Sequence, residues 1–291
     1  MSTNMKKKAA IAALVLLSSA FVLVGDALAA NPAANADELV AQHLDSIASP
    51  AIRAGLKSRV AQGLVHYSIL VGGAGSLDGK AFLVSEGKKL QFMMKLPNNE
   101  YRGEQFIFDG EKDKVAFSMA QQTRSALGNF VFVQDAVIRE GLLGGVLTTA
   151  WPLWNLDERK PKLSFGGLKK IDGQELYDLH YRPRKNSDLD IHLYFDPQTH
   201  RHVETIYSYS VSQGLTLGGE TAAAGQQQNR YRLQEKFSDF KTVDGVTLPN
   251  HYEIQFSQEL QNGRTTLSEW DLKGLDISSN TPVDPRNFEV K

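Results

Sequence analysis

The chain has 291 residues, 42% of them hydrophobic, no cysteine, and a formal net charge of −1 at pH 7. The lack of cysteine excludes disulfides, thiol nucleophiles and thiolate metal sites, and the balanced charge leaves no basic footprint for a nucleic acid. A chain of this length can form one large β domain or two smaller ones, and it can bury a substantial core without covalent cross-links.

The first thirty residues have the three parts of an export signal. Lys6–Lys8 form a basic start, residues 9–24 are apolar apart from two serines, and Ala27-Leu28-Ala29 offers small residues for a signal peptidase. We predict a signal peptide over residues 1–29 and a flexible lead-in over residues 30–36. An uncleaved membrane anchor is the alternative, since the apolar run is only slightly short of a span. With no cysteine for lipidation, the exported chain is expected to be soluble in the periplasm.

A helix and a long series of strands are predicted next. Residues 37–47 place apolar side chains near helical spacing, and Pro50 ends the pattern. Period-2 alternation and turns such as Asp172-Gly173 and Asp244-Gly245 then favour antiparallel hairpins. The predicted strands cover residues 59–71, 80–85, 89–96, 105–108, 114–119, 162–170, 175–182, 190–195, 202–211, 230–240, 246–256 and 265–277. A sheet of about twelve strands is large enough that it must curl.

Several predicted strands are apolar on one face only. Ile191, Leu193 and Phe195 alternate with Asp190 and His192, which is typical of an antiparallel sheet with one covered face. The glycine-, alanine- and glutamine-rich residues 218–229 are expected to form a solvated loop. No convincing domain boundary is visible, so the sequence predicts a single domain of mainly β (α+β) class.

An apolar segment, called here the insert (residues 126–154), interrupts the strand pattern. Residues 129–140 predict a helix capped by Asn129, Gly141 breaks it, and residues 142–151 predict a second short helix. The insert carries no charged residue from Gly141 to Trp154. That length suits a buried or interfacial helix rather than a membrane span.

Two interpretations of the insert remain open: a plug that fills the core, or a lid over a hydrophobic cavity. We favour the lid, with Gly141, Gly144 and Gly145 as hinges, because glycine is unfavourable inside a helix and a plug would be expected to use alanine. The predicted lid side chains are Phe130, Val133, Val137, Leu142, Leu143, Val146, Leu147, Trp151 and Trp154. The predicted cavity walls are Phe82, Phe92, Met94, Phe106, Phe108, Leu193, Phe195, Ile254 and Phe256.

These features resemble a known family. The order of elements resembles the LolA-like superfamily of periplasmic carriers that sort outer-membrane lipoproteins: a helix after an export signal, then a long meander with two inserted apolar helices. Two segments are also similar to that superfamily, FSDFKTVDGVTLPNHYEI at 237–254 and the ending NTPVDPRNFEV at 280–290. The resemblance covers most of residues 37–290. It assigns no gating arginine, because neither Arg59 nor Arg102 can be matched to the family's strand.

The resemblance implies both a fold and a function. Residues 37–291 would form an incomplete β-barrel, or half-barrel, covered by short apolar helices. The protein would be a monomer that holds lipid, or the acyl chains of a lipoprotein, without chemical turnover. Some members of the superfamily sense the state of the cell envelope, so a sensor that binds an inner- or outer-membrane protein is the alternative.

Signs of enzyme chemistry are weak in this sequence. No G-x-S-x-G motif occurs, and the glycine-rich residues 72–79 are better explained as a hairpin loop. The histidines on predicted strands or turns are His180, His192, His200, His202 and His251. A pair of them could hold zinc or copper with a third ligand from a neighbouring strand, but no spacing requires it. We therefore predict no catalytic residue, metal or cofactor, and rank a lipid or glycan hydrolase behind the carrier and the sensor.

An outer-membrane barrel is also disfavoured, because several strands are shorter than the span of about ten residues that such a barrel needs.

Overall fold

The computed structural model describes residues 32–116, 124–185, 187–212 and 228–290. The predicted signal peptide and nearly all of the predicted loop at residues 218–229 lie outside these ranges. Among the described residues, no helix combines the length and apolar character that crossing a membrane requires.

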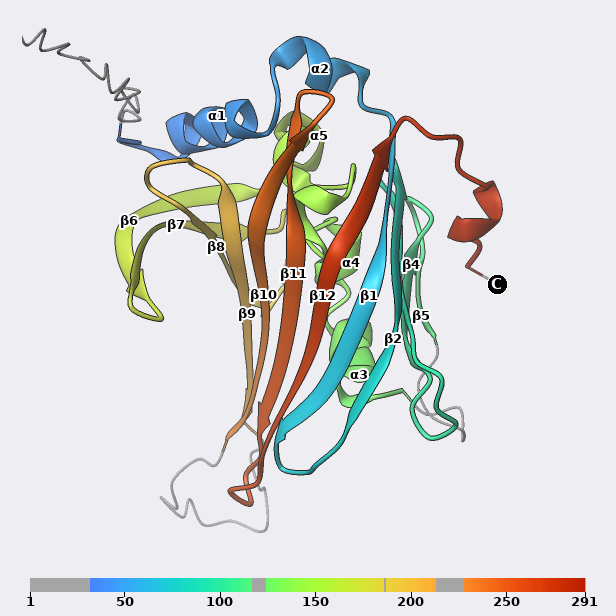
Figure 1. Cartoon of the computed structure of the whole chain (residues 1–291). Coiled ribbons are helices and arrows are strands. Elements are labelled where there is room, and N and C mark those ends of the chain that lie inside the picture. Colours follow the sequence, from blue (N-terminus) through green and yellow to red (C-terminus); the bar gives the residue numbers. More distant parts are fainter. Residues whose placement is uncertain (1–31, 117–123, 186, 213–227, 291) are drawn as a thin grey trace, which may run out of the picture.

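One antiparallel sheet of twelve strands forms the body of the molecule (Figure 1). The strands are β1 Ser58–Val71, β2 Ser76–Glu86, β3 Lys89–Lys95, β4 Gly103–Phe108, β5 Asp113–Ala116, β6 Lys162–Ile171, β7 Gln174–Arg182, β8 Asp190–Phe195, β9 His202–Ser212, β10 Gln228–Val243, β11 Val246–Glu259 and β12 Thr265–Ser279. Their order is β5-β4-β3-β2-β1-β12-β11-β10-β9-β8-β7-β6. The edge strands β5 and β6 do not pair with each other, so the curled sheet stays an open half-barrel, which confirms the predicted fold class.

The pairing of β1 with β12 joins the two halves of the chain. Arg59 lies opposite Ser279, and Tyr67 lies opposite Trp270. Every other pairing joins strands that follow each other in the sequence. One long-range pairing therefore turns two meanders into a single concave surface.

Each strand turns alternate side chains toward the concave face. Ile191, Leu193 and Phe195 of β8 are fully buried in the core. Their neighbours Asp190 and His192 lie on the outer, convex face, because successive side chains of a strand point to opposite sides. This confirms the predicted alternation.

Helices at one end of the half-barrel begin the described chain. Helix α1, Ala36–Ile47, is capped by Asn35, whose side chain accepts a hydrogen bond of 2.9 Å from the amide of Glu38. The short α2, Pro50–Gly55, follows it at the same end (Figure 1). The helix predicted at 37–47 is confirmed. The lead-in is tied to the fold from residue 32 onward, because Ala33 is buried in the core and Asn35 caps α1.

The insert lies in the hollow of the sheet (Figure 1). Its elements are α3 Ala126–Val133, α4 Ala136–Arg139, η1 Gly145–Leu147 and η2 Pro152–Trp154, and α5 Leu156–Arg159 follows. The last element of the chain, η3 Pro285–Phe288, contacts β3 and β4.

Both helix predictions for the insert need correction. The helix predicted at 129–140 is two helices, and Ser125 rather than Asn129 caps the first one. The helix predicted at 142–151 is wrong, since only the single turn η1 forms there. Gly141, Gly144 and Gly145 all have positive φ, at 72°, 79° and 49°. A right-handed helix cannot continue through such residues.

Candidate functional site

The insert and the concave face of the sheet share one hydrophobic core. Of the predicted lid residues, those buried in this core are Phe130, Val137, Leu142, Leu143, Val146, Leu147 and Trp151. Trp154 is partly buried against it, and Val133 is 56% exposed. Of the predicted walls, those in the same core are Phe92, Met94, Phe106, Phe108, Leu193, Phe195, Ile254 and Phe256. The structure therefore brings most of both sets together.

Phe82 is a wrong prediction among the walls. Its neighbours Ala81 and Leu83 belong to the core, whereas Phe82 is only partly buried and has no place in that core. Strand alternation puts it on the convex face, which the run of apolar residues in β2 concealed.

Polar groups of the sheet hold the backbone of the insert. The guanidinium of Arg59 on β1 donates a 2.5 Å hydrogen bond to the carbonyl of Val146. The amide of Gly144 donates at 2.8 Å to the carboxyl of Glu235 on β10. These bonds satisfy peptide groups that would otherwise be buried without partners.

The carboxyl group of Glu235 is fully buried beneath the insert. Besides the Gly144 amide, it accepts hydrogen bonds from the hydroxyls of Tyr207, at 2.5 Å, and Tyr252. Burial raises the pKa of Glu235 from 4.5 to about 7, although its three hydrogen bonds act in the opposite direction.

Arg59 is a buried cation with few partners. Its side chain is fully buried, and Nε and Nη2 have no hydrogen-bond partner among the described residues. Burial lowers the pKa of Arg59 to about 10. The hydrogen bond to Val146 therefore offsets only part of the free-energy cost of removing the Arg59 guanidinium from water.

Two histidines lie beneath Trp151. The indole Nε1 donates to Nε2 of His43 at 3.1 Å, and Nδ1 of His43 donates to the carbonyl of His200 at 3.1 Å. His202 packs against the Trp151 ring at a centroid distance of 4.6 Å. Burial lowers the pKa of His43 to about 3 and that of His202 well below 6.5. His202 is therefore part of the packing under the insert, whereas the ring of His200 stacks on Tyr177 of β7.

The three glycines predicted as hinges occupy tight turns. A Cβ on Gly141 would lie 2.1 Å from the carbonyl oxygen of Ala150, and one on Gly145 would lie 2.9 Å from the ring of Phe237. Space and positive φ both require glycine here, so the presence of glycine instead of alanine does not distinguish a lid from a plug. A hinge role stays a prediction.

The turn between β1 and β2 lies at the end of the half-barrel away from α1 and α2 (Figure 1), and this turn forms part of the lining of a pocket of about 520 Å³. Its lining includes the apolar side chains Tyr67, Leu77, Leu127, Phe256 and Trp270. The ring of Phe256 also contacts that of Phe130 in α3, with 5.2 Å between centroids. The pocket therefore adjoins the interface between the insert and the sheet.

Sequence reasoning found Phe256 but missed the rest of this lining. Tyr67 and Trp270 pair across β1 and β12, and their rings lie 5.2 Å apart. Their positions in the period-2 pattern could have marked them as inward-facing. Nothing local, however, indicated that β1 and β12 are neighbours.

A row of polar side chains on the convex face resembles a hydrolase triad. Ser238 Oγ lies 2.9 Å from Nδ1 of His251, whose Nε2 lies 2.6 Å from Asp271. The same aspartate pairs with Lys273, and Ser238 and His251 are opposite residues of β10 and β11. Pairing across adjacent strands produces such rows without any reaction, so we assign no catalytic role.

No protein-family model matches the sequence, and the search of curated proteins returns no match. Solved structures are similar over most of the chain. A LolA superfamily protein from Nitrosomonas europaea has 15% identity and a TM-score of 0.45, covering 88% of this chain and 98% of that one. A putative outer-membrane lipoprotein-sorting domain from Vibrio parahaemolyticus has 10% identity and a TM-score of 0.44, covering 86% and 95%. A DUF1329 family protein from Desulfovibrio piger has 13% identity and a TM-score of 0.46, covering 87% and 97%. These similarities assign neither a ligand nor a partner to this chain.

Proposed function

We propose that this protein is exported to the periplasm and reversibly binds an acyl chain, of a lipid or of a lipoprotein, between the insert and the concave face, without chemical turnover. The observation that carries the proposal is the pocket at the end of the half-barrel away from α1 and α2. Phe256 lines this pocket and also contacts Phe130 of α3 in the core. A volume of about 520 Å³ suits a small ligand site. We expect a longer chain to enter further as the insert moves away from the sheet.

The composition of the site suits an aliphatic ligand. Each methylene moved from water into such a site contributes about 0.8 kcal/mol, so ten methylenes contribute about 8 kcal/mol. Before the cost of immobilising the chain, that corresponds to a Kd of about 1 μM. Polar side chains such as Asn98, Glu100 and Ser268 also line the pocket. The aromatic and aliphatic part offers little shape specificity, so several chain lengths should bind.

The first test is to find the ligand. The chain would be expressed with its own N-terminal residues, purified from periplasm without detergent, and examined by native mass spectrometry followed by organic extraction. We expect one acyl-bearing molecule per chain. A protein that carries none, and that takes up neither a fluorescent fatty acid nor an acylated peptide, would contradict the proposal.

A pocket-filling variant locates the site. Ser268 lines the pocket and is half-buried, so Ser268→Trp places a bulky side chain there without removing core atoms. We expect fatty-acid affinity to fall at least tenfold. The matched control Ser210→Trp, at an exposed position of β9, should bind like the wild type. Equal binding by both variants would place the ligand elsewhere.

A sensor that binds a membrane protein is the second candidate, and two exposed side chains favour it. Phe132 and Val133, at the end of α3, are 47% and 56% exposed, and two adjacent exposed apolar side chains offer a contact point for a partner protein. A sensor predicts that Phe132→Ser with Val133→Ser abolishes copurification of a membrane protein while the lipid content stays unchanged. A carrier predicts no stable membrane-protein partner other than an acylated cargo.

A further inference from the structure

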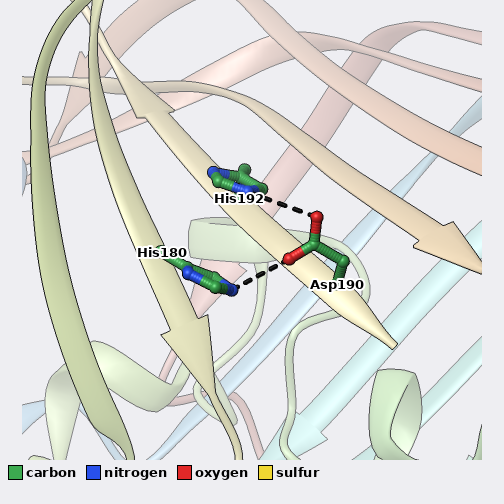
Figure 2. A group of neighbouring side chains, drawn as sticks. All are labelled: His180, Asp190 and His192. Carbon is green, nitrogen blue, oxygen red and sulfur yellow. Dashed lines mark ion pairs between the residues drawn. The ribbon is translucent and has the colours of Figure 1, made fainter. Parts of the chain in front are cut away.

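Two imidazoles and a carboxylate gather on the convex face of the sheet (Figure 2). His180 lies on β7, and Asp190 and His192 lie on β8. Each offers one ligand atom, and these three atoms lie within 4.8 Å of one another. The residues next to them in the strands, Leu179 and Ile191, are buried in the core, so the cluster is on the opposite side of the sheet from the pocket.

The three side chains are in direct contact. Nε2 of His180 lies 2.9 Å from one oxygen of Asp190, and Nε2 of His192 lies 3.5 Å from the other. The two imidazole rings are opposite each other in the register of β7 and β8 and stack with 4.6 Å between centroids. Two ligands on a tetrahedral zinc ion are about 3.3 Å apart, given metal–ligand distances of about 2.0–2.1 Å. A shared zinc ion would replace the contacts to Asp190, and the two stacked rings, with 8° between their planes, would tilt so that both nitrogens face it.

A buried carboxylate orients one of the imidazoles. Oδ1 of Asp178 accepts a 2.6 Å hydrogen bond from Nδ1 of His192, and Asp178 is only 5% exposed. A proton on Nδ1 leaves the lone pair of Nε2 directed toward Asp190. Metal-binding histidines commonly donate their second N–H group to a carboxylate in this way.

The backbone opposite Asp178 is shaped to fit this carboxylate. The β6–β7 register shifts between Phe165 and Gly167, and a Cβ on Gly166 would lie 2.4 Å from Oδ2 of Asp178. A glycine at this position gives the Asp178 side chain room next to His192.

We propose that His180, Asp190 and His192 bind one zinc ion on the convex face, with Asp178 as the positioning residue for His192. Two imidazole nitrogens and one carboxylate oxygen are a ligand set that zinc prefers, and three protein ligands leave a fourth position for water. The Asp190 side chain is 53% exposed, so the fourth position faces solvent. The site does not depend on the proposed lipid binding.

The test is isothermal titration of untagged, chelator-treated protein with zinc chloride. We expect one zinc ion per chain. Asp178→Asn should weaken binding by about 10- to 100-fold, and His180→Ala or His192→Ala should weaken it more. X-ray absorption of the zinc complex should show only nitrogen and oxygen ligands.

A second histidine–aspartate pair provides the matched control. His251 on β11 lies 2.6 Å from Asp271 on β12, but Lys273 occupies the other side of that carboxylate. His251→Ala should therefore bind zinc like the wild type. Should His192→Ala unfold, His192→Gln keeps a polar side chain beside Asp178 and serves in its place.

Three results would overturn the proposal. They are absence of zinc binding at 100-fold molar excess, undiminished binding after substitution of either His180 or His192, and an equal loss in His251→Ala. Undiminished binding by Asp178→Asn would remove the positioning role.

Discussion

The buried carboxyl group of Glu235 offers a direct test of how the insert is held to the sheet. It is surrounded by the hydroxyls of Tyr207 and Tyr252 and by the Gly144 amide. Burial raises the pKa of Glu235 from 4.5 to about 7 in the folded protein, whereas the unfolded chain exposes the group to water.

The sign of the pH dependence follows from this difference. Because the pKa is higher in the folded state, the folded protein binds the proton more tightly. The resulting stabilisation is fully present below about pH 4.5 and is lost as the pH rises through 7. One pKa unit corresponds to about 1.4 kcal/mol, so the loss reaches roughly 3 kcal/mol by pH 8.

The perturbation is Glu235→Gln, whose side chain stays neutral at every pH and keeps both accepting and donating atoms. The free energy of unfolding would be measured with urea at pH 5, 6, 7 and 8 for both proteins. We expect the stability of the variant, relative to the wild type, to rise by roughly 2.5 kcal/mol between pH 5 and 8. Glu104, whose pKa burial also raises to about 7, is present in both proteins and cancels. A difference that stays constant from pH 5 to 8 would refute this reasoning.

Three further predictions concern stability. Gly141→Ala should destabilise the protein by at least about 2 kcal/mol more than Gly167→Ala, as measured by urea unfolding. Both residues have φ of 72°, but only at Gly141 would the added Cβ meet a backbone oxygen, at 2.1 Å. Equal losses of stability would mean that backbone strain alone matters. Burial lowers the pKa of His43 to about 3, so its contribution to stability is present above pH 6.5 and is lost as the pH falls. The free energy of unfolding of His43→Gln should therefore fall less steeply than that of the wild type between pH 6.5 and 4. An equally steep fall would contradict the burial of a neutral His43. Phe92→Ala should cost about 3–5 kcal/mol, whereas Phe82→Ala, outside the core, should cost less than half as much by thermal unfolding; similar costs would restore Phe82 to the core.

Much of the fold could be predicted because strand and turn signals are local. Alternation in β8 identified Ile191, Leu193 and Phe195 as core residues, and the structure buries all three. The same reasoning failed in β2, where Phe82 lies in a run of consecutive apolar residues that does not show which side chains face the core. The prediction of helices in the insert failed for a different reason. Gly144 and Gly145 have positive φ, and the sequence pattern alone does not distinguish such glycines from glycines within a distorted helix.

The candidate sites were less predictable, because they depend on register across strands. Tyr67 and Trp270 line the pocket together only because β1 pairs with β12. Arg59 had no distinguishing mark in the sequence, yet it is a buried donor to the insert. Sequence reasoning had considered His180 and His192 as members of a metal-binding pair, but had found no third ligand.

The sequence by itself determined the strands, their inward faces, the apolar insert and the predicted export signal, because hydrophobic periodicity, turn residues and signal features are all read within a few consecutive positions. Only the tertiary structure decided that the insert packs into the hollow, that Glu235 lies beneath it, and that Asp190 contacts two stacked imidazoles. Those outcomes depend on which strands become neighbours and in what register. The burial of one shared core selects that arrangement, and no local stretch of sequence encodes it.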